Sequence, residues 1–425
     1  MRNKRKALNA RVEVEEDRIS KMPDHILHNI LSPLPTKDVV ATSVLSTRWR
    51  DVWTSIPILE FKSLDFKRRR MFNKLVLPIL HRYNLNRVER FNDDGTRAPM
   101  SFMNSVDRVL FFHDLTLLQK FTLQIQCSED CDQSRIHAWI SAILRHKVRE
   151  LNLNIDLKVP FGFPYRLFAS SSLVKLVIEM DGALRLPTSI SFPSLKIFIL
   201  ILINFRDGDL NEKLFCSCPV LEDLHLKNCC WVNYLEFRFS SPSLKFLTIE
   251  EYETVNEDDL EKLETVNNLG CCIMIQAPNL VSFRYATDYM PRNYLDLELP
   301  SLSDADVIFP AQVLSVEGLH YCASTLLQGL STVKSLKLSS EIFQGFHYCS
   351  RIRKSLPKRF KLIHLKNVDV RCYRVKEDFN MVLFFYKNAP HLDGINVGNS
   401  VRPSKLPIRR PKVQRGAISE GTNHS

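Results

Sequence analysis

Apolar residues recur in one short pattern through the middle of the chain: one apolar residue, two others, an apolar residue, one other and an apolar residue (LxxLxL). The phrase LEDLHLKNC fits it, with Leu221, Leu224 and Leu226 at the apolar positions and Cys229 closing the longer form LxxLxLxxC. Because the second and third apolar residues are two apart, both face the same side of a short β-strand. The pattern is typical of a leucine-rich repeat and predicts a strand at each copy.

Copies of this pattern start 22 to 36 residues apart, so the repeat is degenerate and carries insertions. Clear copies start at Leu118, Val148, Leu173, Leu195, Leu221, Leu244 and Leu280, and weaker ones at Ala311, Val333, Phe360 and Leu392. One strand cannot bury its own apolar face but stacked neighbours can, which predicts a curved solenoid with a parallel sheet on its concave side. A leucine-rich helical bundle is the alternative. Prolines before several copies (FPSLKIF, CPVLEDL, SPSLKFL, APNLVSF) favour the solenoid, because proline ends a connecting helix.

The N-terminal region changes to a helical period. Pro23 and Asp24 suit the first turn of a helix, and Ser32-Pro33 should end it. The apolar face of this helix consists of Ile26, Leu27, Ile30 and Leu31. The spacing therefore predicts one amphipathic helix between Pro23 and Pro33.

Two further short helices follow in LPTKDVVATSVLSTRWRDVW. Thr36 is the predicted cap of one, which carries Val39, Val40 and Ala41, and Ser46 is the predicted cap of the other. Trp49, Val52 and Trp53 lie on one face of the last helix. Three helices in so few residues cannot bury their apolar faces well, so we expect a partner surface. We expect Trp49 at that interface and Trp53 at the seam toward IPILEF and the solenoid.

The net charge of the chain does not identify the class of its partner. Over 425 residues, Lys+Arg 58 and Asp+Glu 47 give a net charge of +11, which is compatible with nucleic acid or with an acidic protein. Basic residues cluster at 2–6, at 67–70 and in the tail, and disorder is predicted for both termini. The first cluster or the tail could act as a nuclear-import signal. No interleaved aromatic residues suggest base stacking, so nucleic acid is not the expected partner.

No segment predicts membrane insertion or secretion. The N-terminus has no apolar region of the signal-peptide kind, and the longest apolar run, 197–203, is far shorter than the roughly 20 residues that a membrane span needs. We therefore expect a soluble protein in the nucleus, the cytoplasm or both.

Residues with catalytic or metal-binding chemistry form no known pattern. The eleven cysteines have no zinc spacing and are expected to be reduced, mostly buried thiols, with Cys216 and Cys229 in the core. GxSxG, HExxH and glycine-rich phosphate loops are absent from the sequence. We expect no catalytic residue, no metal and no cofactor. An acidic segment at 250–264 fits a solvated loop or a patch for a basic substrate.

Residues 17–61, DRISKMPDHILHNILSPLPTKDVVATSVLSTRWRDVWTSIPILEF, resemble a plant F-box, above all in PDHILHNIL, LPTKDVVATSVLS and RWRDVW. The resemblance implies docking on a small acidic Skp-type adaptor, which links the F-box to a cullin. Carried over by position, the docking residues are Pro23, Ile26, Leu27, Ile30, Leu31, Leu34, Pro35, Val39, Val40, Leu45 and Trp49. Some of them must also form the core of the unit, and the sequence does not apportion them.

The resemblance extends toward the C-terminus. Residues 103–123 are similar to the segment that opens the repeats of plant F-box/LRR proteins, and 356–397 are similar to the FBD region that often ends them. The expected order is a disordered basic N-terminus (1–16), an F-box (17–63), a linker with connecting helices (64–102), degenerate leucine-rich repeats (103–355), an FBD-like region (356–397) and a disordered basic tail (398–425).

Together these features predict an α/β protein, with a three-helix F-box before a leucine-rich-repeat solenoid that has a parallel sheet. The resemblance implies a non-catalytic substrate adaptor of a Skp-cullin-F-box (SCF) ubiquitin ligase, whose repeats bind a protein target. Two alternatives stay open: an F-box protein with little substrate binding, and a basic nucleic-acid-binding protein. The sequence predicts neither the substrate nor the residues that contact it.

Overall fold

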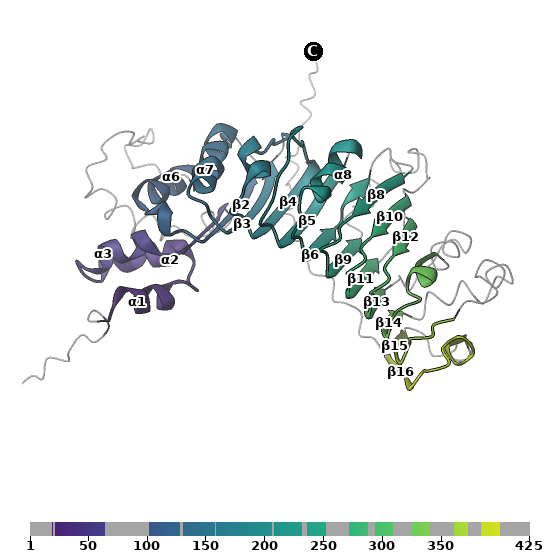
Figure 1. Cartoon of the computed structure of the whole chain (residues 1–425). Helices are drawn as coiled ribbons and strands as arrows, with labels where there is room; N and C mark the ends of the chain where they lie inside the picture. Colours follow the sequence, from purple (N-terminus) through teal and green to yellow (C-terminus); the bar gives the residue numbers. More distant parts are fainter. Residues whose placement is uncertain are drawn as a thin grey trace, which may run out of the picture.

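The chain forms a small helical unit followed by a long parallel sheet, as the α/β prediction requires (Figure 1). The computed structural model describes residues 19, 22–63, 102–127, 131–157, 159–205, 208–231, 236–251, 272–287, 294–308, 325–339, 361–372 and 384–399. The predicted disordered termini, the basic clusters and most of the 64–102 linker lie outside the described residues, except for Gly398 and Asn399, which belong to a strand rather than to a disordered tail. So does the acidic segment, except for Glu250 and Glu251, which belong to a strand.

The helical unit contains the three predicted helices. They are α1 (Asp24–Leu31), α2 (Thr36–Ala41) and α3 (Trp49–Val52), with short 3-10 turns η1 (Thr42–Val44) and η2 (Trp53–Ser55) after the second and third. α1 begins after Pro23 and ends before Ser32, as predicted.

The two predicted caps are wrong. The N-cap of α2 is Pro35, and that of α3 is Arg48, two residues after Ser46; neither N-cap makes a side-chain capping bond. Thr36 is instead the buried first residue of α2, and its Oγ1 accepts a hydrogen bond from the backbone N–H of Glu60 at 2.6 Å. The threonine therefore joins the helices to the next element rather than closing its own helix.

Within the described residues, the parallel sheet contains twelve strands in one continuous order and a short thirteenth strand, β7 (Cys230–Trp231), beside β5. The order is β1 (Ile58–Lys62), β2 (Lys120–Cys127), β3 (Glu150–Leu157), β4 (Lys175–Ala183), β5 (Ile197–Phe205), β6 (Asp223–Lys227), β9 (Phe246–Glu251), β11 (Ser282–Thr287), β13 (Asp304–Ile308), β14 (Ser335–Ser339), β15 (Asn367–Cys372) and β16 (Gly394–Asn399).

The LxxLxL pattern sets the register of this sheet. Each of the seven clear copies, and the weaker copies at Val333 and Leu392, starts two residues before a strand. At the entry to each rung, two consecutive backbone N–H groups donate to one carbonyl of the preceding rung. For example, Glu222 and Asp223 both donate to Lys196 at 2.9 Å. This repeated hydrogen-bonding pattern stacks one strand on the next at a constant offset.

One weak copy is wrong as a strand prediction, and another is not tested. The copy at Ala311 lies outside the described residues, and β13 lies between β11 and β14. The copy at Phe360 precedes the strand β15, whose buried residues are Val368 and Val370. β15 and β16 extend the sheet, so the described part of the FBD-like region continues the solenoid.

One face of the sheet is covered. After the F-box unit, the described helices α6 (Phe102–Phe112), α7 (Gln133–Arg145) and α8 (Gly208–Cys216) lie on the outer side of the arc (Figure 1). Beyond them, a second parallel sheet of β8 (Glu236–Ser240), β10 (Cys272–Gln276) and β12 (Tyr294–Glu298) covers the same side. No pattern in the sequence predicted this second sheet. The core between the layers runs as one cluster from the F-box helices to the last strands.

The helical unit and the sheet are joined through β1. This strand, ILEFK, pairs with β2 in parallel, and its Leu59 and Phe61 are buried in the common core. Trp53 is buried immediately before it, at the predicted seam. Among the described residues, no helix is long and apolar enough to cross a bilayer.

Candidate functional site

The predicted docking residues of the F-box divide into a core set and a surface set. The side chains of Leu27, Leu31, Val39, Val40 and Trp49 are buried among the helices. Trp49 was expected to face a partner, but only 5% of it is exposed, so the structure places it in the core. Burying these residues holds together a unit whose individual helices are too short to be stable alone.

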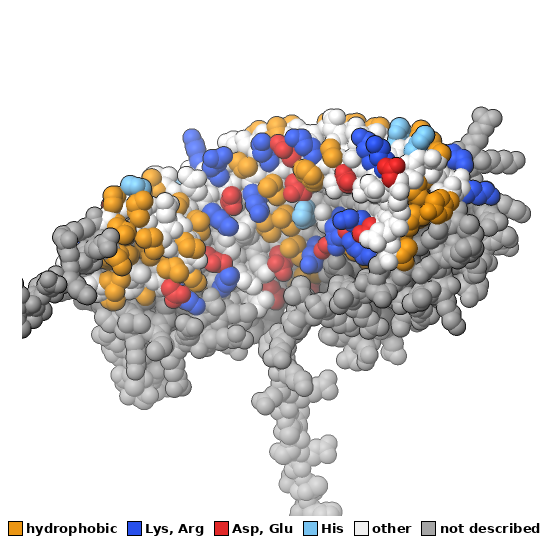
Figure 2. Space-filling view, turned by 90° about the horizontal axis from the view of Figure 1, so that it is seen from below, with side chains coloured by type: hydrophobic (Ala, Val, Ile, Leu, Met, Phe, Trp, Pro, Cys, Tyr) orange, Lys and Arg blue, Asp and Glu red, His pale blue; other side chains and the backbone are white. Residues whose placement is uncertain are grey.

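The surface set forms an exposed apolar region that we call the F-box surface. It consists of Pro23, Ile26, Ile30, Leu34, Leu45 and the half-buried Pro35 from the predicted set, together with Val44. Ile30 is 48% exposed and Leu45 is 65% exposed. Figure 2 shows hydrophobic side chains gathered at this end of the molecule. Apolar side chains grouped on a solvated surface mark an interaction site.

Val44 is the surface residue that sequence reasoning missed. Its place at the end of η1, beside Leu45, leaves it 53% exposed. The one available signal was its apolar character next to Leu45 in the phrase SVLS. In a continuous α-helix, Val44 would lie on the same face as the buried Val40, four residues earlier, but the change to a 3-10 turn moves its side chain outward.

Polar contacts fix the position of α1 beside this surface. Arg48, at the start of α3, donates a hydrogen bond to the Asp24 carboxylate at 2.6 Å and another to the carbonyl of Met22. The Arg48 hydrogen bond lowers the pKa of Asp24. His28, on the same helix, lies 3.0 Å from the Ser55 hydroxyl. These contacts hold α1 against α3 and thereby fix where Ile26 and Ile30 point.

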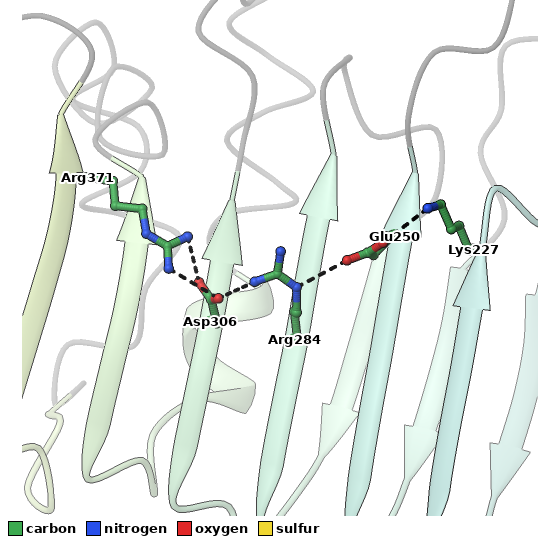
Figure 3. A network of polar contacts seen from close by, with 5 residues as sticks. All are labelled: Lys227, Glu250, Arg284, Asp306 and Arg371. Carbon is green, nitrogen blue, oxygen red and sulfur yellow. Dashed lines mark hydrogen bonds and ion pairs between the residues drawn. The ribbon is translucent and has the colours of Figure 1, made fainter. Parts of the chain in front are cut away.

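The second candidate surface is the inner face of the sheet, opposite the helices. Successive side chains of a strand point to opposite faces, so the residues between the apolar positions of the pattern all reach this face. In the C-terminal half they form a chain of ion pairs (Figure 3). Lys227 lies 4.0 Å from Glu250, and Arg284 lies 3.2 Å from the other oxygen of Glu250. Arg284 also contacts Asp306, and Arg371 reaches across β14 to the same carboxylate at 3.2 Å.

This network neutralises the inner face locally. Positive and negative side chains alternate from β6 to β15, so the paired groups present no long stretch of one sign (Figure 3). Exposed pairs of this kind stabilise a fold weakly, each by less than about 1 kcal/mol. The arrangement fixes side-chain positions on the surface more than it contributes to overall stability.

The cysteines are unsuited to nucleophilic catalysis where they are buried. Burial raises the pKa of Cys218 and of Cys229 to about 12, so both thiols stay protonated. Two expectations from the sequence are corrected here: Cys216 is exposed rather than in the core, and Cys131 is disulfide-bonded rather than reduced. Within the described ranges, no group of His, Cys, Asp and Glu side chains could hold a metal ion.

Both parts of the chain are similar to known proteins. Residues 19–61 match the F-box domain, and residues 136–303 match the LRR repeats of FBD-associated F-box protein At5g56370. F-box protein At4g27050 of Arabidopsis thaliana is 32% identical over 79% of this chain and 70% of its own length. The putative F-box/LRR-repeat protein At3g59170 of the same plant is 30% identical over 89% of this chain and 80% of its own length.

The chain belongs to the F-box/LRR-repeat family. A relative with the FBD region, F-box/FBD/LRR-repeat protein At1g78750 of Arabidopsis thaliana, is 28% identical over 97% of this chain and 84% of its own length. The F-box match covers α1 to β1, so in this F-box/LRR-repeat protein the match includes most of the first strand of the sheet. The helical unit is therefore joined to the repeat region by hydrogen bonds between strands and by a shared core.

Proposed function

We propose that this F-box/LRR-repeat protein is the substrate-recognition subunit of an SCF-type ubiquitin ligase. The F-box surface docks an acidic Skp-type adaptor and, through it, a cullin, and the repeat region binds a protein target. The observation that carries this proposal is the group of exposed apolar side chains on the F-box helices, at one end of a long sheet. The subunit itself needs no catalytic residue, because holding a target near a charged conjugating enzyme raises the effective concentration.

The hydrogen-bonded junction between the two parts supports this role. The backbone N–H of Gln119 donates to Pro57 at 2.8 Å, and that of Asp114 donates to Thr54 at 2.7 Å. His113 Nε2 lies 2.8 Å from the carbonyl oxygen of Ile56. Because β1 is also paired with β2, a target on the sheet would be held at a fixed position relative to the adaptor.

Co-purification with a Skp-type adaptor and cullin tests the proposal. We expect wild type to retain both, and Ile30→Asp to retain at least tenfold less adaptor, because a charge at an apolar contact costs about 2 kcal/mol or more. Ile363→Asp is the matched control, since Ile363 is 50% exposed but precedes β15, far along the chain from the F-box. Wild type that retains neither partner, where another F-box protein does, would overturn the proposal.

The net charge of +11 keeps nucleic acid binding as a second candidate. The alternating charges on the inner face argue against it there, because phosphate backbones require a concentrated positive surface. Tight filter binding of DNA that weakens steeply with salt would favour this alternative. A third candidate is an F-box protein that binds little substrate. It should retain the adaptor, but no target should accumulate with it.

The target and the location of the protein can be sought together. We propose that it acts in the nucleus, the cytoplasm or both, which a fluorescent fusion would reveal. Proximity labelling with wild type and with Ile30→Asp should identify targets that accumulate with the variant, because it still binds them without recruiting the ligase. Equal labelling by both proteins would count against ubiquitin-dependent turnover.

A further inference from the structure

The middle of the inner face carries an unusual run of apolar side chains. Ile197, Ile199 and Ile201 on β5 alternate with buried Phe198 and Leu200, and all three isoleucines are partly exposed. Val177 of β4 pairs in register with Ile199 and is also partly exposed. We call Val177, Ile197, Ile199 and Ile201 the isoleucine strip. Figure 2 shows hydrophobic side chains in the middle of this face, between charged ones.

A backbone irregularity extends this apolar surface. The register between β4 and β5 shifts between Glu179 and Gly182, and Leu202 has a positive φ of 61°. Positive φ is strained for a residue with a side chain, and such strain recurs at functional sites. The bulge leaves two consecutive residues, Ile201 and Leu202, partly exposed where strict alternation would bury one of them.

Uncharged polar side chains lie beside the isoleucine strip on β2 and β3. We call Thr122, Gln124, Asn152 and Asn154 the amide strip. The side-chain amide of Asn152 donates to Thr122 at 3.3 Å, while its oxygen is buried and has no hydrogen-bond partner among the described residues. This oxygen can accept a hydrogen bond from a ligand once the Asn152 amide rotates to bring it to the surface, and side-chain amides can both donate to and accept from a peptide backbone.

The two strips share one line across the sheet. Thr122, Asn152, Val177 and Ile199 are in register on four adjacent strands. Strands lie about 4.8 Å apart, so this line measures about 14 Å, the length of roughly four extended residues. A short extended peptide crossing the strands could therefore contact amides at one end and isoleucines at the other.

The surroundings favour an uncharged ligand. Beyond the strip, the long ion-pair chain starts with Lys227 on β6, and its carboxylates already have cationic partners. A charged ligand on the isoleucine strip would lose water against apolar side chains, and the charges of Glu179 and Lys227, in register on either side of Ile201, already interact with each other. An apolar side chain would instead remove the exposed isoleucines from water.

We propose that the isoleucine strip and the amide strip together bind an extended, uncharged segment of the target protein that carries an aliphatic or aromatic side chain. The isoleucines and Val177 contact this side chain, and Asn152 and its neighbours hydrogen-bond the segment's backbone. The identity of the ligand as a ubiquitination target rests on the proposed function, but its binding to these strips does not require the adaptor.

A phage-displayed library of random linear peptides, screened on the full chain, tests this site. Enriched peptides should contain an aliphatic or aromatic residue with uncharged neighbours, and their affinity should change little with salt. We expect Ile199→Asn to weaken the best peptide at least tenfold. Ile308→Asn is the matched control, because Ile308 is partly exposed on β13 of the same sheet, away from both strips, and we expect less than a twofold change.

A second pair of variants tests the amide strip. Asn152→Ala should weaken the same peptide severalfold, whereas Asn396→Ala, which replaces the same residue type on β16, should leave it unchanged. Ile199→Leu keeps the apolar surface and should bind normally, which separates loss of contact from loss of folding. Three results would each overturn the proposal: enrichment of charged peptides, no enriched peptide, or Ile199→Asn and Asn152→Ala binding the peptide as tightly as wild type does.

Adaptor retention by the same proteins separates the two proposals. Ile199→Asn should co-purify with the Skp-type adaptor as well as wild type does. If wild type retains the adaptor but does not bind the predicted peptides, the proposed peptide site is wrong and the proposed ligase role is unaffected. If wild type binds the peptides but not the adaptor, the proposed ligase role is wrong and the peptide site is supported.

Discussion

The F-box unit and the repeat sheet use their apolar residues in opposite ways. The sheet buries the apolar positions of nearly every rung and presents mainly polar side chains on its inner face. The F-box unit buries one set and exposes another, with Ile26, Ile30, Leu34 and Leu45 among the exposed large hydrophobic residues. The sheet thus obtains stability from its own stacked neighbours, whereas the F-box unit leaves apolar surface for another protein.

The largest expected effect is on the core of the sheet. Phe198 on β5 is fully buried and its ring lies 6.1 Å from that of Phe192. Phe198→Ala should lower the free energy of unfolding by about 3–5 kcal/mol, because it leaves a cavity. Ile30→Ala on the F-box surface should change it by less than about 0.5 kcal/mol. Urea unfolding monitored by circular dichroism measures both, and similar values for the two variants would contradict this comparison.

A smaller effect is expected at the junction of the two regions. Thr36→Val keeps the shape of the side chain but removes the acceptor for the Glu60 N–H. We expect a loss of about 1–3 kcal/mol, because that amide is left without a partner. Thr36→Ser, which restores the hydroxyl, is the control. Hydrogen exchange should show faster exchange of the Glu60 amide in Thr36→Val only; unchanged exchange would mean that this bond does not hold β1.

The same junction should make stability depend on pH. Burial lowers the pKa of His113 below its ordinary value of 6.5, against the opposing effect of its hydrogen bond to Ile56. The unfolded chain therefore binds this proton more readily than the folded chain. The stability contributed by the neutral ring is complete above pH 6.5 and is lost as the pH falls toward the lowered pKa of the folded state.

His113→Gln tests this dependence, because glutamine can keep an N–H donor near Ile56 but does not titrate. Melting temperatures measured from about pH 7 to about pH 5 should fall less steeply for the variant than for wild type. His25→Gln, an exposed histidine of α1, is the control and should follow wild type. Parallel curves for His113→Gln and wild type would refute the role of this ring.

The smallest effect is expected in the ion-pair network of the inner face. Asp306→Asn weakens the contacts with Arg284 and Arg371, yet the side chains are partly exposed. We expect a loss of at most about 1 kcal/mol that shrinks at high salt. Asp369→Asn, two strands further along the same sheet, serves as the reference. A loss of several kcal/mol would show that this face, unlike the F-box surface, is essential to stability.

Much of the sheet could be predicted because its periodicity follows from one physical requirement, burial of two side chains two residues apart. Where that requirement is met by a small residue, the pattern disappears: β13 buries Ala305 with Val307, and sequence reasoning passed over it. The second sheet was missed because its short strands resemble loops until their apolar residues are packed against the first sheet. Its placement depends on tertiary contacts that no local pattern contains.

The candidate surfaces were predictable only in part. The positions of the F-box residues followed from the sequence, but the burial of Trp49 and the exposure of Leu45 depend on how α2, η1 and α3 are packed. The isoleucines of β5 were visible as a long apolar run. Their exposure could not be inferred, because a buried strand of a parallel sheet has the same composition.

The pairing of β1 with β2 has a consequence for how members of this family could be recombined. The F-box unit supplies the terminal strand of the sheet, so it acts as the end cap of the repeat array. A chimaera that exchanges only the helices and omits Ile58–Lys62 would leave β2 as an open edge, prone to pairing with other chains. The exchangeable module therefore ends after Lys62. Exchanging it between proteins requires that β2 of the recipient can pair with the β1 strand of the donor.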